Sequence, residues 1–149
     1  MSRATPEMRD LSRRLITYET KTKPAETIPS ESFHVCEKLR PHLATLTGNA
    51  GFRALLSRAL ALANAEVPWL RTVHVKADGS MEGLNELNAQ VEPKEFAEGS
   101  VVVLAQLLGL LVAFIGENLT LRMVREVWPK LPQINDLNLG KGDKNEKAK

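Results

Sequence analysis

The feature that most constrains this chain is a run of fifteen residues, 101–115 (VVVLAQLLGLLVAFI), in which Gln106 is the one strongly polar side chain. As an α-helix this run is about 22 Å long. A bilayer core is ~30 Å thick and needs about 20 apolar residues, so the run is too short by about a turn and a half. Charge bounds it at Glu98 and at Glu117. A helix buried in protein is therefore favoured over a membrane span.

Small residues recur at every fourth position of this run, at Ala105, Gly109 and Ala113. On a helix they form one ridge, along which a second backbone can approach closely. We predict that this ridge packs against another helix, within one chain or between two copies. Two membrane roles remain as alternatives for the run: a permanent span, or a helix that a soluble bundle hides and then releases into a bilayer.

Two amphipathic segments are available to surround a central helix. Apolar side chains are spaced by three and four over residues 33–46 and again over 52–63. Pro41 predicts a break near Leu39, because proline removes a backbone donor and clashes with the preceding turn. Gly48 is a candidate for the end of the first segment. The short connection predicts that the two helices run antiparallel.

The chain between these segments and the apolar run has a different period. Val73 and Val75 alternate with polar neighbours, and Asp78 and Gly79 form a turn signal. This pattern is compatible with a short β-hairpin. From residue 94 onward a helical pattern returns, either as one long helix or as a helix interrupted by its glycines.

Together these patterns predict an all-α fold, a helical bundle of four to six helices around a central apolar helix at about 94–116. One short β-hairpin, at about 72–83, is an optional addition. We expect an N-terminal helix or arm, a linker, a helical core domain and a disordered C-terminal tail, the last because its polar, glycine-containing sequence lacks a core pattern. The N-terminal helix or arm spans 1–19, the linker 20–29, the helical core domain 30–132 and the tail 133–149.

Charge and cysteine content limit the classes of function. The 149 residues include 20 basic and 18 acidic side chains, a net charge of +2. Such a balance provides no strong electrostatic attraction for nucleic acid or anionic lipid. Cys36 is the single cysteine, which excludes an intramolecular disulfide and fits a reducing compartment. The first residues lack the apolar core of a secretory signal, so we expect a cytoplasmic protein.

No pattern of catalytic or metal-binding residues emerges. His34, His42 and His74 lack the spacing of a metal site with Cys36 or with one another. Cys36 falls on an apolar helix face, where burial keeps a thiol inert. We therefore expect no catalytic residue, no metal and no cofactor, and a protein that is not an enzyme.

One weak binding site is conceivable near the turn TGNAGF. The free N–H groups that begin the following helix attract anions, and Arg40, Arg53 and Arg58 lie nearby in the sequence. The turn lacks the lysine and the spacing of a phosphate-binding loop. The same two helices could form a DNA-binding helix-turn-helix, but the second offers few polar side chains to base edges.

These observations favour a non-enzymatic, small intracellular interaction or regulatory protein that self-associates through apolar helices. Its partner is itself, as a homo-oligomer, or another protein. The first alternative is a membrane-associated or membrane-inserting helical protein that uses residues 101–115. The second is a ligand- or nucleic-acid-binding helical module, for which the balanced charge gives little support.

Overall fold

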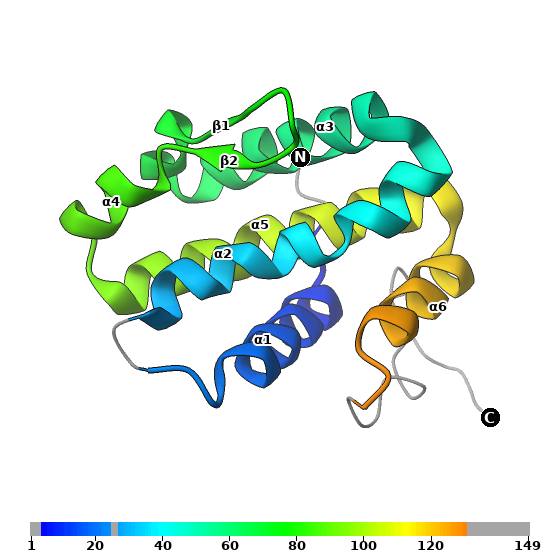
Figure 1. The fold of residues 1–149 in the computed structure, drawn as a ribbon, viewed down its shortest axis with the longest axis horizontal. Coiled ribbons are helices and arrows are strands. Elements are labelled where there is room, and N and C mark those ends of the chain that lie inside the picture. Colours follow the sequence, from blue (N-terminus) through cyan, green and yellow to red (C-terminus); the bar gives the residue numbers. More distant parts are fainter. Residues whose placement is uncertain (1–3, 25–26, 131–149) are drawn as a thin grey trace.

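The computed structural model describes residues 4–24 and 27–130; the predicted tail 133–149 lies outside the described residues, as does part of the predicted linker. The described residues confirm an all-α bundle with one small hairpin (Figure 1). In chain order the elements are α1 (Pro6–Thr20), α2 (Ile28–Lys38), α3 (Arg40–Glu66), the 3₁₀ helix η2 (Pro68–Thr72), β1 (His74–Val75), β2 (Met81–Glu82), α4 (Leu84–Gln90), α5 (Pro93–Ile115) and α6 (Glu117–Val127).

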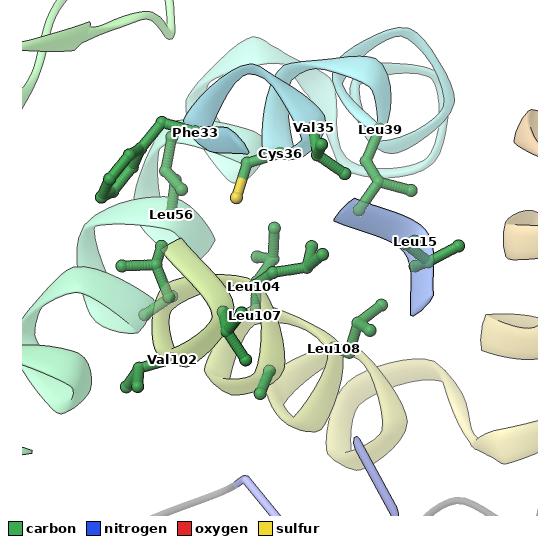
Figure 2. Close-up of a cluster of buried hydrophobic side chains, with 14 of the residues drawn as sticks. Leu15, Phe33, Val35, Cys36, Leu39, Leu56, Val102, Leu104, Leu107 and Leu108 are labelled. Carbon is green, nitrogen blue, oxygen red and sulfur yellow. The ribbon is translucent and has the colours of Figure 1, made fainter. Parts of the chain in front are cut away.

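The predicted central apolar helix is α5, which packs against α1, α2 and α3. Figure 2 shows the core between these helices, where Leu104 and Leu107 of α5 lie beneath Cys36 of α2. By length and composition α5 could also cross a bilayer, but 67% of its most apolar 18-residue window is buried inside the protein. Helix α5 is thus largely enclosed by the other helices of the bundle.

The one strongly polar side chain in the apolar run has a partner inside the protein. Gln106 is fully buried, and its Nε2 donates to Oε2 of Glu66 at 3.4 Å. The same carboxylate oxygen accepts a hydrogen bond from Nη2 of Arg9 at 2.5 Å. Through Glu66 the two hydrogen bonds link α1, α3 and α5. The buried amide of Gln106 therefore has a hydrogen-bond partner, as buried polar groups usually do.

Proline and glycine account for most of the helix boundaries. Helix α2 ends at Lys38 and α3 begins at Arg40, so the break predicted at Leu39 is confirmed. Gly48 has φ 80° and ψ 164° and kinks α3 at the predicted position, where the chain reverses direction (Figure 1). Gly116, with φ 92°, separates α5 from α6, whereas Gly99 lies within an uninterrupted helix.

The β-hairpin is present and is fastened to α3. Its antiparallel strands pair His74 with Glu82 and Val75 with Met81. In the turn, Oδ1 of Asp78 accepts hydrogen bonds from the Ser80 hydroxyl and backbone N–H, which lower the pKa of this carboxyl. The backbone oxygen of Asp78 accepts a bond of 2.5 Å from Nη1 of Arg40. A two-stranded hairpin is marginal alone, and this attachment supports it.

Helix α1 packs against α2 and α5 and buries Met8, Leu11 and Leu15. Thr5 caps its first turn by accepting a hydrogen bond from the backbone N–H of Met8 at 3.2 Å. On its outer side Arg13 makes a two-bond contact with Glu98 of α5, at 2.5 and 2.6 Å. This contact raises the pKa of the Arg13 guanidinium. Helix α1 is therefore part of the bundle in this structure.

Candidate docking groove

The predicted ridge of small residues is divided between the core and the surface. Ala105 and Gly109 are buried in the single chain, while Ala113, one turn further on, is exposed. The first two residues therefore serve packing within the bundle. Of the three ridge residues, only Ala113 is accessible to a second copy.

The three arginines of the weak anion site have different surroundings. Arg40 is engaged by Asp78 and lies 3.5 Å from Oε1 of Glu37. Nε of Arg53 is buried without a hydrogen-bond partner, and Arg58 is exposed on α3. Because Arg40 fastens the hairpin, it is not free to turn to an anion. A site formed by all three stays a prediction.

The lone thiol is enclosed by the core. Cys36 has no exposed surface, and burial raises its pKa to about 12. A thiol with so high a pKa is almost entirely protonated at neutral pH and is a poor nucleophile. Within residues 4–24 and 27–130, no three His, Cys, Asp or Glu side chains gather closely enough to hold a metal ion.

The most accessible apolar side chains lie at one end of the bundle. Among the described residues, the large apolar side chains that are exposed are Leu46 at 50%, Phe114 at 62% and Leu119 at 37%. They belong to the α3 kink, the last turn of α5 and the first turn of α6. These three segments lie together at the right of Figure 1. This end of the molecule is therefore the best candidate for a binding surface.

A groove of about 410 Å³ runs between the start of α3 and α6 at this end. Its rim carries charge: Nε2 of His42 lies 3.8 Å from Oε1 of Glu126, and Arg122 lies one turn before Glu126. Its walls combine apolar and polar side chains from both helices, namely Pro41, His42, Thr45, Leu46, Leu119, Arg122, Met123 and Glu126. A partly apolar groove with a charged rim is suited to a protein segment.

The geometry of α6 explains why Leu119 faces outward. Gly116 turns the chain, so that α6 packs on α5 through a face that includes Leu121 and Val124. Leu119 falls outside that stripe and is left on the groove side with Arg122. The groove is not apparent in the sequence, because its two walls are more than seventy positions apart. One available signal was Leu119, an apolar residue off the apolar stripe of α6.

Two other hollows in the described residues are smaller and have a larger polar share in their walls. One of about 280 Å³ lies between α1, α2 and α5 and is lined by the Arg13–Glu98 ion pair together with Lys94. Another, of about 320 Å³, lies beside the hairpin with His74, Glu82 and Glu86 on its walls. Neither combines exposed large apolar side chains with a groove.

Comparison with known proteins adds no functional information. No family model, curated protein or solved structure matches this chain at a significant level.

Proposed function

We propose that this chain is a non-enzymatic, intracellular interaction protein that pairs with a second copy of itself through the α6 end of the bundle. The observation that carries the proposal is the groove that the exposed side chains of Leu46 and Leu119 line, with exposed Phe114 on the last turn of α5, the helix that precedes α6. Burial of such side chains against a partner is favourable at about 25 cal/mol per Å². A self-associating protein conceals this surface in its dimer.

The charges on α6 support a second copy as the partner. Arg122 and Glu126 are both exposed and lie one helical turn apart. If two α6 helices meet antiparallel about a twofold axis, Arg122 of each copy faces Glu126 of the other. A twofold interface must be self-complementary in this way. The same pair of side chains thus makes two reciprocal ion pairs.

A membrane-inserting role for α5 is the alternative, motivated by its length and apolar composition. It requires α5 to leave its contacts with α1, α2 and α3. It also requires Gln106 to give up its bond to Glu66. Both losses oppose the insertion of α5 into a membrane, which is why we prefer self-association as the proposal.

Light scattering on the full chain after size-exclusion chromatography tests the proposal. We expect a species of twice 16.5 kDa that dissociates on dilution. Phe114→Glu and Leu119→Glu should each shift the equilibrium toward the monomer. Ala89→Glu is the matched control, because Ala89 is exposed on α4, away from the groove. A monomeric mass at the highest soluble concentration would overturn the proposal.

Charge reversal tests the twofold geometry itself. Arg122→Glu should weaken dimerisation, because it sets like charges against each other in both reciprocal pairs. The double change Arg122→Glu with Glu126→Arg should restore it. Protein that floats with liposomes, and that remains monomeric without them, would favour the membrane alternative.

A further inference from the structure

The chain continues beyond α6 from a point beside the groove. Glu126 lines the groove, and Pro129 and Lys130 form a turn just after it. Nineteen residues, 131–149, follow Lys130. Nine extended residues reach about 30 Å, whereas the eleven residues of α6 span about 16 Å. The first half of this segment is thus long enough to run back along the whole of α6.

The chemistry of residues 131–139 (LPQINDLNL) matches the groove. Four of its nine side chains are Leu or Ile, at Leu131, Ile134, Leu137 and Leu139. The remaining ten residues, GKGDKNEKAK, contain no large apolar side chain. Asp136 is the single charged residue of 131–139, and the groove rim offers it the guanidinium of Arg122.

We propose that residues 131–139 of the same chain occupy the groove, with Ile134 and Leu137 against its apolar wall and Asp136 toward Arg122. A tethered segment has an effective concentration in the millimolar range, so modest affinity is enough to fill the groove. The segment then competes with the second copy for Leu46 and Leu119. This competition, though not the occupancy, rests on the proposed dimerisation.

Thiol labelling of the full chain measures the occupancy directly. Thr45 is an exposed groove residue, and Thr45→Cys places a reactive thiol there. The native Cys36 does not interfere, because it is fully buried with a pKa of about 12. The probe is iodoacetamide, used at a protein concentration below that at which light scattering detects a dimer. Under this condition a second copy cannot account for protection.

Two charged substitutions in the segment displace it. Ile134→Asp with Leu137→Asp should raise the labelling rate at position 45 at least about fivefold, as expected when a mostly occupied state is lost. Gln133→Glu with Asn138→Asp adds the same charge at polar positions and should leave the rate unchanged. Labelling at Asn88→Cys, on exposed α4, should not respond to either pair.

The outcomes separate the two proposals. An unchanged rate at position 45 in the Ile134→Asp, Leu137→Asp variant overturns occupancy by the segment. Protection that appears only at concentrations where dimer forms assigns the groove to the second copy and also overturns it. Faster labelling together with a larger dimer fraction supports both proposals. Faster labelling of a protein that never dimerises supports the occupancy and contradicts the proposed function.

Discussion

The indole nitrogen of Trp128 donates a hydrogen bond of 2.6 Å to Oε2 of Glu19, and so joins the residue after α6 to α1 across 109 positions of sequence. The same carboxylate oxygen lies 3.1 Å from Nζ of Lys38 at the end of α2. Trp128 is almost fully buried, and its hydrogen bond to Glu19 is partly buried. The carboxylate of Glu19 thus connects α1 to the end of α2 and to the end of α6.

Trp128→Phe should lower the free energy of unfolding by about 1.5–3 kcal/mol, because it removes a hydrogen bond to a charged group and some buried ring surface. Chemical denaturation measures the loss. Glu19→Gln keeps an acceptor and separates charge from hydrogen bonding. In a double-mutant cycle with Trp128→Phe and Glu19→Ala, which removes the acceptor, additive effects would show that the two side chains are not coupled.

Gly99 is required by the ring of Trp69, not by the backbone of α5. A Cβ placed on Gly99 would lie 2.6 Å from Cη2 and 2.8 Å from Cζ2 of Trp69, and that ring stacks on Phe96 at 5.7 Å. Gly99→Ala should therefore destabilise the protein, even though alanine gains up to about 1 kcal/mol of helix propensity.

Combining Gly99→Ala with Trp69→Phe tests this explanation. The smaller ring lacks the clashing atoms, so in that background Gly99→Ala should become neutral or stabilising. Thermal unfolding of the four proteins gives the comparison. The explanation fails if Gly99→Ala has the same sign in both backgrounds.

Gly109 and Ala113 make a matched pair on one face of α5. Gly109 is buried and Ala113, four positions later, is exposed. Gly109→Leu should overpack the core and cost about 1–3 kcal/mol. Ala113→Leu should change stability by less than about 0.5 kcal/mol, as is usual for surface sites. Equal melting curves for the two variants would contradict this placement of the ridge.

Burial of Cys36 predicts a loss of stability in alkali. Its thiol has a pKa of about 12 in the folded protein, against about 8.5 for an ordinary thiol, so the unfolded chain ionises first. The stability that the protonated thiol contributes is complete at pH values below about 8.5. It is lost as the pH rises toward about 12, the pKa in the folded protein. The slope is about 1.4 kcal/mol per pH unit. Chemical denaturation at several pH values measures the free energy of unfolding of the native protein and of Cys36→Ala. The difference between the two proteins should fall with this slope.

Local features of the fold could be predicted from sequence because they depend on neighbouring residues. Pro41 sets the break between α2 and α3, Gly48 provides a positive φ, and Asp78 with Gly79 forms a turn. Gly99 shows the limit of such reasoning. Its sequence context left open a break in the helix, but the helix continues through it, and the ring of Trp69 from a distant segment explains why this position is a glycine.

The groove could not be predicted, because it depends on which helices become neighbours. Leu46 belongs to the apolar pattern of residues 33–46, yet it remains exposed, and Leu119, although it lies off the apolar stripe of α6, does not indicate which helix forms the opposite wall. Gln106 illustrates the converse. It is a polar residue within the apolar run, and Glu66, forty positions earlier in the sequence, accepts a hydrogen bond from its buried side chain. The partner of a buried polar group is a property of the tertiary structure.

The central position of α5 also dictates when this protein can fold during its synthesis. Helices α1, α2 and α3 all pack against α5, which begins at Pro93 and ends at Ile115. At ~5–20 residues per second, roughly 2–10 s separate the appearance of Glu66 from that of Ile115. During that interval the three earlier helices lack the helix that they all pack against, and the apolar side chains that α5 covers stay open to solvent. The bundle therefore closes late, when its most apolar helix leaves the ribosome.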